Sequence, residues 1–255
     1  MKIKKIPVVV ALTTFMVVIS VSLYRCRSTS RLATSYKADT LYTNSEGKGE
    51  LLEVDFKRGP EHNHPLMAIW IEDREGDYIQ TLYVAESIAK GVFGHGDKTT
   101  GKWLPGPIRR PAALPVWSHS RGVQEEDGLY IPTEETAIPD AYTGATPPAD
   151  FVLMARTDKP LPREFYVYFE INQTWDWNKY WTNNKFPDDA EYKSSCQPAL
   201  VYRTLLNKSD RNGMEFLELI GHSHYNGSNG EIESDLSTIT TAKEITKSIG
   251  VRILK

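Results

Sequence analysis

The sequence predicts an all-β fold, an antiparallel β-sandwich with long loops, preceded by a helix that is a membrane anchor or a signal peptide. Apolar residues in the large C-terminal part recur mostly at every second position, which is the period of a half-buried strand. Pro- and Gly-rich connections separate these segments, and regularly alternating helices are absent. Many short strands with turn residues between them are typical of a sandwich.

The strand predictions follow from this period of two. Residues 165–169 are apolar on both faces, which predicts a central strand covered on both sides. Residues 67–72 and 78–84 are joined by a short Gly-containing loop and predict a hairpin. Short helices are predicted at 87–90 and 241–248. The remaining strands are predicted at residues 51–56, 151–156, 199–206, 214–221 and 251–254, with the central one spanning 164–172.

The N-terminal segment is apolar and flanked by basic residues. Residues 6–24 carry no charge, and as a helix rising about 1.5 Å per residue they approach the roughly 30 Å hydrocarbon thickness of a bilayer. No small-residue cleavage site ends the run. Residues 1–26 are therefore predicted to be an uncleaved signal anchor, with a cleaved signal peptide or lipidation of Cys26 as alternatives. The large domain is placed in the periplasm, anchored to the inner membrane or exported.

A polar linker is predicted over residues 27–49 and a single β-sandwich domain over 50–255. The 13 Tyr, 8 Phe and 6 Trp are sufficient for a large core. The net charge is −3 and no Lys/Arg-rich run occurs, which argues against binding to nucleic acid. The chain has two cysteines; Cys26 falls at the membrane edge, and Cys196 is predicted to be a small packed side chain.

Residues 140–146 read Asp-Ala-Tyr-Thr-Gly-Ala-Thr. This resembles D-x-x-[ST]-G-A-T, the pattern at which flavin transferases attach flavin mononucleotide (FMN) to a threonine hydroxyl through a phosphodiester. The resemblance implies covalent FMN at Thr146, with Asp140, Thr143, Gly144 and Ala145 as the rest of the recognised pattern. Two following prolines keep the segment extended. The alternative is a tight turn, in which Asp140 and Thr143 bond to nearby backbone and Gly144 adopts a positive φ.

Several separated segments together resemble a family of predicted periplasmic proteins, domain-of-unknown-function family 2271. The segments are residues 68–82, 114–118, 140–146, 221–230 and 235–242, and the resemblance spans about residues 50–255. It implies an immunoglobulin-like domain similar to that of flagellar hook-capping proteins. It also implies a setting of PepSY-type membrane proteins and flavin transferases, and thus extracytoplasmic redox chemistry. Established flavin-carrying domains place the motif in a different, α+β fold.

Four large aromatic residues follow the central strand candidate within seven positions. They are Trp175, Trp177, Tyr180 and Trp181. Such a cluster can stack on a flavin ring or on a sugar, or it can cap the end of the sandwich, because aromatic side chains dominate core burial. The cap is the favoured role, and ligand stacking is the alternative.

Two His-x-His pairs, His62/His64 and His222/His224, are candidate metal ligands. In extended chain, each pair points both imidazoles to one side, which suits zinc or copper. No cysteine joins them at zinc-finger spacing. Gly227 and a second glycine three residues later instead favour a turn whose histidines bond to backbone.

No residue pattern assigns a reaction. The sequence lacks G-x-S-x-G, H-E-x-x-H, a P-loop and a Rossmann fingerprint, so a non-enzymatic role is favoured and the question stays open. The leading hypothesis is a membrane-anchored extracytoplasmic β-sandwich of a redox or cofactor-handling system, with covalent FMN and with a flavin transferase and a membrane redox protein as partners. The alternatives are a cell-envelope binding or assembly module for a protein or glycan, and a periplasmic metal-binding protein.

Overall fold

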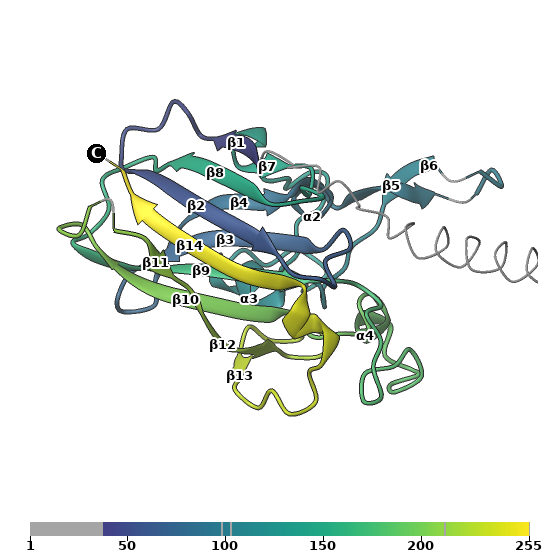
Figure 1. Ribbon diagram of the computed structural model, residues 1–255. Helices are drawn as coiled ribbons and strands as arrows, with labels where there is room; N and C mark the ends of the chain where they lie inside the picture. The colour runs from purple at the N-terminus through teal and green to yellow at the C-terminus, as the bar shows by residue number, and fades with distance from the viewer. Residues whose placement is uncertain (1–37, 98, 103, 212, 255) are drawn as a thin grey trace, which may run out of the picture. The chain divides into compact units, whose positions relative to one another are not determined.

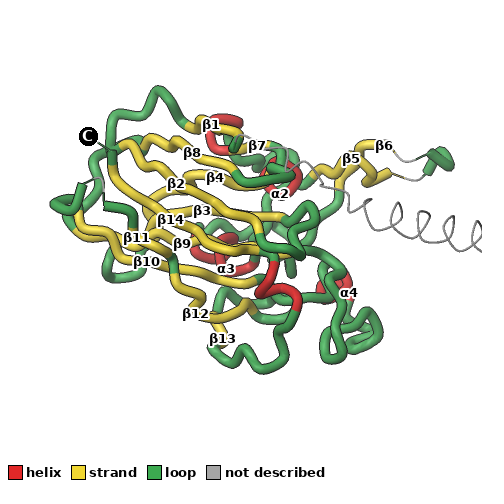
Figure 2. Tube along the Cα trace, viewed as in Figure 1, coloured by secondary structure: helices red, strands yellow, loops and turns green. Residues whose placement is uncertain are grey.

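Two β-sheets dominate the computed structural model, which describes residues 38–97, 99–102, 104–211 and 213–254. Figure 1 shows the sheets as neighbouring layers, and Figure 2 shows that strands and loops make up nearly all of the coloured chain. The predicted anchor or signal helix at residues 1–26, with Cys26, lies outside the described residues. Among the residues that are described, no helix is both long and apolar enough to span a bilayer.

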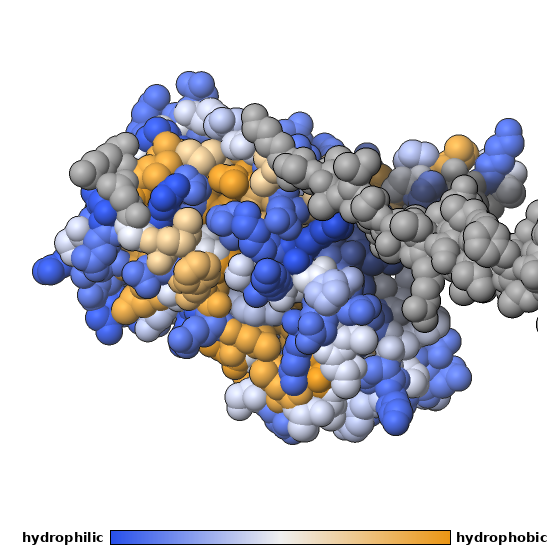
Figure 3. Space-filling model, in the orientation of Figure 1, coloured by the Kyte–Doolittle hydropathy of each residue, from blue (hydrophilic) through white to orange (hydrophobic). Residues whose placement is uncertain are grey.

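One sheet has five strands, which are β1 (Asp39–Thr43), β2 (Leu51–Arg58), β8 (Phe151–Arg156), β11 (Glu215–Phe216) and β14 (Thr246–Ile253). Their order across the sheet is β1-β8-β2-β14-β11. In β2, Leu52, Val54 and Phe56 are buried and alternate with partly exposed polar residues, as the period of two predicts. On the face seen in Figure 3, hydrophobic residues form several separate groups between charged ones.

The other sheet has seven strands, which are β3 (Leu66–Glu72), β4 (Tyr78–Ala85), β7 (Thr143–Gly144), β9 (Glu164–Asn172), β10 (Leu200–Asn207), β12 (Glu218–Ser223) and β13 (Ile232–Glu233). Their order is β13-β12-β10-β9-β3-β4-β7. β9 lies between β10 and β3 and is buried over most of its length, which confirms the predicted central strand. The predicted hairpin of β3 and β4 is confirmed as well.

The main core lies between the two sheets. Phe56 of β2 stacks on Phe151 of β8 and on Phe169 of β9, so the two sheets meet through aromatic rings. Met67, Ile69 and Ile71 of β3 belong to the same buried cluster. This face-to-face packing gives the chain a mostly β, sandwich-like arrangement.

A second buried cluster covers the other face of the seven-stranded sheet. It joins Trp70 of β3 and Tyr168 of β9 to two short helices, α2 (Glu86–Lys90) and α3 (Pro115–Ser120), and to the loop after α3. Trp117 of α3 is fully buried in this layer, and its indole nitrogen donates to the hydroxyl of Thr81, 2.9 Å away. The layer explains why both faces of β3 and β9 are apolar.

A hairpin arm extends away from the sheets (Figure 1). It consists of β5 (Val92–Asp97) and β6 (Leu104–Pro107). The guanidinium carbon of Arg110 lies 4.3 Å from the centroid of the Phe93 ring in the arm and 4.8 Å from the centroid of the Trp175 ring. These two cation–π contacts connect the arm to the long loop between β9 and β10.

The structure differs from the sequence-based expectation at several places. The single strand expected at residues 214–221 is two strands, β11 and β12, which belong to different sheets. The sheets are mixed rather than purely antiparallel, because β1 pairs parallel with β8 and β7 pairs parallel with β4. β1 lies within residues 27–49, which were expected to be a linker, and the compact unit begins at Ala38. The helix expected at residues 241–248 is a short 3₁₀ turn, Thr241–Glu244, followed by β14, whose pairing with β2 overrides local helix propensity.

Candidate functional site

The motif at residues 140–146 lies at an edge of the seven-stranded sheet. Its first residues form a 3₁₀ turn, Asp140–Tyr142, and Thr143 and Gly144 form β7. Thr143 pairs with Val84 and Gly144 with Ala85, both in β4. Because β7 is the last strand of the sheet, its other edge has no strand partner among the described residues. The motif is therefore held by backbone pairing on one side of β7.

The side chain of Tyr83, in β4, is hydrogen-bonded to the centre of the motif. Its buried hydroxyl lies 3.1 Å from the carbonyl oxygen of Gly144 and 3.0 Å from that of Ala145, and it donates its hydrogen to this pair of acceptors. Burial raises the pKa of the Tyr83 phenol, so the hydroxyl keeps its proton.

Close packing, and not a turn, favours a glycine at position 144. A Cβ atom there would lie 3.1 Å from Cε2 of Tyr83, which is tighter than ordinary van der Waals contact. Gly144 is not among the residues with positive φ, so the left-handed turn considered from the sequence is wrong.

Side chains at the start of the motif fix it to the rest of the domain. The carboxylate of Asp140 lies 3.0 Å from the ammonium group of Lys90 in α2. The hydroxyl of Tyr142 donates to the carboxylate of Asp158, at 2.8 and 2.9 Å from its two oxygens. Burial and this carboxylate raise the pKa of Tyr142 to about 12. These bonds give residues 140–145 a defined conformation.

Thr146 lines a pocket of about 360 Å³. Three parts of the chain form it: the motif, helix α2 and the β5–β6 arm. Its lining residues are Glu86, Ser87, Lys90, Val92, Gly94, Pro105, Ala145 and Thr146. Pockets for small ligands and cofactors fall in the range of about 300–1,000 Å³, so the volume suits such a molecule. Thr146 is half-buried, and the pocket lies next to it.

Lys90 is the cation of this pocket. Its ammonium group lies 2.7 Å from the carboxylate of Glu86 and 3.0 Å from that of Asp140. These two hydrogen bonds raise the pKa of Lys90 and keep it charged. Lys90 is thus already paired with two carboxylates. An anionic group that enters the pocket would have to bind Lys90 alongside these carboxylates or displace one of them from it.

The four aromatic residues of the 173–199 loop separate into two groups. Trp181 is 6% exposed, and its indole nitrogen lies 3.2 Å from the hydroxyl oxygen of Thr238, so it packs into the core as the cap hypothesis expects. Trp175, Trp177 and Tyr180 are 50%, 53% and 48% exposed. None of the four lines the pocket beside Thr146. Stacking on a flavin at Thr146 thus has no support from the geometry of this pocket.

The histidine pairs have separate surroundings. Nδ1 of His222 is 2.7 Å from the carbonyl oxygen of Ser223, which agrees with a histidine bonded to backbone, whereas Nδ1 of His224 is 3.1 Å from the carboxylate of Glu233. Burial lowers the pKa of His62, and His64 is exposed. Within the described residues, no three His, Cys, Asp or Glu side chains converge to hold a metal ion. The metal-binding hypothesis gains no support from this arrangement.

Glu170 was not singled out from the sequence, although it is the one acidic residue in an otherwise apolar stretch of β9. Its side chain is fully buried and faces α3, where its two oxygens accept hydrogen bonds from the backbone N–H groups of Val116 at 3.2 Å and Trp117 at 2.8 Å. Burial raises the pKa of Glu170 to about 8, while the two N–H donors oppose the shift. The contacts join α3 to the sheet.

The motif, helix α2 and the arm thus meet at the pocket that Thr146 lines. No protein-family model, curated protein or solved structure matches this chain. The resemblances to family 2271 and to flavin acceptor sites stay predictions that rest on the residues quoted for them.

Proposed function

We propose that this chain is an extracytoplasmic carrier of covalently bound FMN in a redox system, with the flavin attached to Oγ of Thr146. The observation that supports the proposal most directly is the pocket of about 360 Å³ beside that threonine. The edge position of β7 also supports the proposal, because no further strand pairs with it among the described residues.

The attachment is a phosphoryl transfer. A flavin dinucleotide supplies the FMN phosphoryl group to the transferase. Oγ of Thr146 attacks the phosphorus, the new O–P bond forms, and the P–O bond to the nucleoside monophosphate breaks. The hydroxyl proton passes to a base of the transferase or to solvent, and no electrons are exchanged. This chain supplies the acceptor hydroxyl and its orientation.

The chemistry of the residues that line the pocket is compatible with a flavin linked to Thr146. Val92 and Pro105 of the arm offer an apolar surface, and Ser87 offers a hydroxyl for hydrogen bonding. Lys90 is the cation that would face the phosphodiester, in competition with the carboxylates of Glu86 and Asp140. When bound, FMN supplies the electron chemistry, and the protein contributes its position and surroundings.

The same proposal includes an immunoglobulin-like fold and a periplasmic location. The two-sheet core supports an immunoglobulin-like sandwich, although the two parallel strand pairs depart from a purely antiparallel one. An N-terminal signal anchor would place the domain in the periplasm, where a flavin transferase and a membrane redox partner could reach it.

The experiment is co-expression of the full chain with a periplasmic flavin transferase, followed by a denaturing gel and intact-mass measurement. We expect a yellow-fluorescent band and a mass increase of one FMN less one water. Thr146→Val removes the hydroxyl at nearly constant volume and should abolish both signals. Thr204→Val makes the same chemical change on β10 and should leave both intact.

A dark, unmodified wild-type chain would overturn the proposal if a known acceptor domain becomes fluorescent in the same cells. So would a mass increase that persists in Thr146→Val, because the modification would then lie on another residue.

A further inference from the structure

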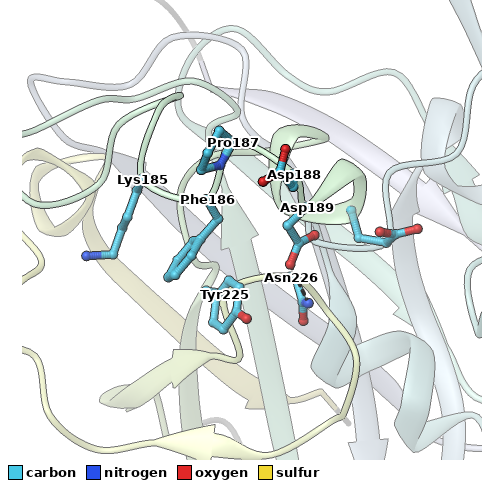
Figure 4. A pocket seen from close by; sticks show the side chains of 8 residues that line it. Lys185, Phe186, Pro187, Asp188, Asp189, Tyr225 and Asn226 are labelled. Atoms are coloured by element: carbon cyan, nitrogen blue, oxygen red, sulfur yellow. Dashed lines mark hydrogen bonds between the residues drawn. The ribbon is translucent and has the colours of Figure 1, made fainter.

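A second pocket lies on a different part of the domain, where the 173–199 loop meets the turn after β12 (Figure 4). The loop contains the short helix α4 (Ala190–Lys193) and joins β9 to β10. The pocket has a volume of about 470 Å³, within the range that holds small organic ligands. None of the residues that line the pocket beside Thr146 belongs to it.

One wall of this pocket is aromatic and rigid. The rings of Phe186 and Tyr225 stack with their centroids 4.3 Å apart and an interplanar angle of 26°. The edge of Phe186 packs on the ring of Tyr192, 5.0 Å away, and Tyr192 is fully buried. Phe186 and Tyr225 remain partly exposed and line the cavity. Because the two rings stack on each other, the faces between them are closed, and the pair offers the cavity its outer apolar surface. Rings held in this way lose little conformational entropy when a ligand binds.

The pocket also carries three carboxylates as hydrogen-bond acceptors, of which that of Asp189 is held in place. Asp189 caps α4 by accepting from the backbone N–H of Tyr192 at 2.8 Å, and its other oxygen accepts from the amide of Asn226, also at 2.8 Å (Figure 4). Each carboxylate oxygen still has a free lone pair. The carboxylates of Asp188 and Glu191 line the pocket and have no side-chain partner among the described residues.

The charge of the pocket selects among ligand classes. Three carboxylates and one ammonium group line the pocket; the ammonium group, that of Lys185, lies 3.2 Å from the centroid of the Tyr180 ring and 5.5 Å from that of the Phe186 ring. This balance opposes phosphates and acidic sugars. A metal ion is not favoured either, because no three acidic or histidine side chains converge in the described part of the chain. Neutral hydroxyl groups can donate to the carboxylates without a charge penalty.

We propose that this pocket binds a neutral pyranose ring of a glycan. One C–H face of the sugar packs against the Phe186–Tyr225 wall, and its hydroxyl groups donate to the carboxylates of Asp188 and Asp189. A pyranose ring has an apolar C–H face and a rim of hydroxyl groups. The site offers an aromatic surface for that face and planar carboxylate acceptors for the hydroxyl groups. This glycan-binding proposal does not depend on flavin attachment at Thr146.

The test is a calorimetric titration of the full chain, expressed without a flavin transferase. The probes are neutral tetrasaccharides of glucose, mannose, galactose and N-acetylglucosamine, with tetragalacturonate as the acidic probe. We expect at least one neutral probe to bind, and tetragalacturonate to bind at least about ten-fold more weakly because its carboxylates meet those of the pocket.

Variants then locate the site. Tyr225→Ala removes half of the aromatic wall, and Asp188→Asn removes a charged acceptor at constant shape; each should weaken binding by roughly ten-fold. Asp188 is exposed and unpaired in the described chain, so its variant is expected to fold normally. Trp177→Ala, in the same loop but outside the pocket, and Thr146→Val should leave binding unchanged. Failure of every neutral probe to bind, or binding insensitive to both pocket variants, overturns the proposal.

Discussion

The hydroxyl of Tyr83 lies 3.0 Å from the carbonyl oxygen of Ala145, the residue immediately before the threonine to which flavin is proposed to be attached. The same hydroxyl lies 3.1 Å from the carbonyl oxygen of Gly144. Tyr83 belongs to β4, and the next two residues of that strand pair with β7. The backbone immediately before Thr146 is therefore held in place. A transferase that attaches flavin there would meet a motif with a defined shape.

Tyr83→Phe removes this hydroxyl and keeps the ring. We expect a loss of about 1 kcal/mol in the free energy of unfolding, because two backbone carbonyls lose their donor. Hydrogen exchange of the backbone around β7 should become faster, while the rest of the sheet stays protected. Tyr42→Phe, at a tyrosine that is largely exposed, is the control. Unchanged exchange around β7 would mean that the strand pairing alone holds the motif.

Gly144→Ala tests the packing of the motif on the Tyr83 ring. The new Cβ would lie 3.1 Å from Cε2 of Tyr83, so the ring has to shift slightly and we expect a loss of about 1 kcal/mol in unfolding free energy. The loss should be smaller in a Tyr83→Leu background, which a double-mutant cycle by urea denaturation would measure. Gly94→Ala is the matched control, because nothing lies within 4 Å of its added Cβ. Equal losses in both backgrounds would contradict the proposed contact.

Strand positions could be predicted from the sequence where a short run of residues shows a clear pattern of apolar and polar side chains. The bounds expected for β8 and β9 agree with those observed, because burial on one or both faces leaves a clear pattern in a run of six to nine residues. The hairpin of β3 and β4 was predictable for the same reason, with a glycine in its loop.

Non-local pairing was not predictable from one sequence. β1 looks like a polar connection, and the partner that makes it a strand, β8, follows more than a hundred residues later. The motif of the candidate site was recognised as a pattern, but its pocket needs the β5–β6 arm, whose strands are rich in Gly and Pro and carry no alternation. Phe186 and Tyr225 likewise meet through the fold and not through their spacing.

Cys196 is buried, and burial raises the pKa of its thiol, so the reactive thiolate is scarce. In the Cys26→Ser chain, we expect a thiol reagent to label Cys196 at least roughly 100-fold more slowly in buffer than in denaturing urea, since labelling requires local opening. The exposed position Ser209, changed to cysteine in the Cys26→Ser, Cys196→Ser chain, should react at similar rates under both conditions. Rapid labelling of Cys196 in buffer would show that the loop around it opens readily.

The buried carboxyl of Glu170 should make stability depend on pH. Its pKa is about 8 in the folded protein and near 4.5 when exposed, because burial disfavours the charged form. Between these values the folded state binds one more proton than the unfolded state. The free energy of unfolding therefore falls as pH rises through this window, by about 1.4 kcal/mol per pH unit at most.

Glu170→Gln isolates this contribution. The amide keeps the shape of the side chain but cannot lose a proton, so the variant should lack the decrease in stability between about pH 5 and pH 8 that urea denaturation detects in the wild type. His62 and His119, whose pKa values are lowered by burial, give an opposite slope in part of this range, and it cancels when the two profiles are subtracted. Glu164→Gln, at a carboxyl whose pKa is lowered by Arg74, should shift the profile without changing its slope. Parallel profiles for wild type and Glu170→Gln would show that the two backbone N–H donors of α3 keep Glu170 ionised.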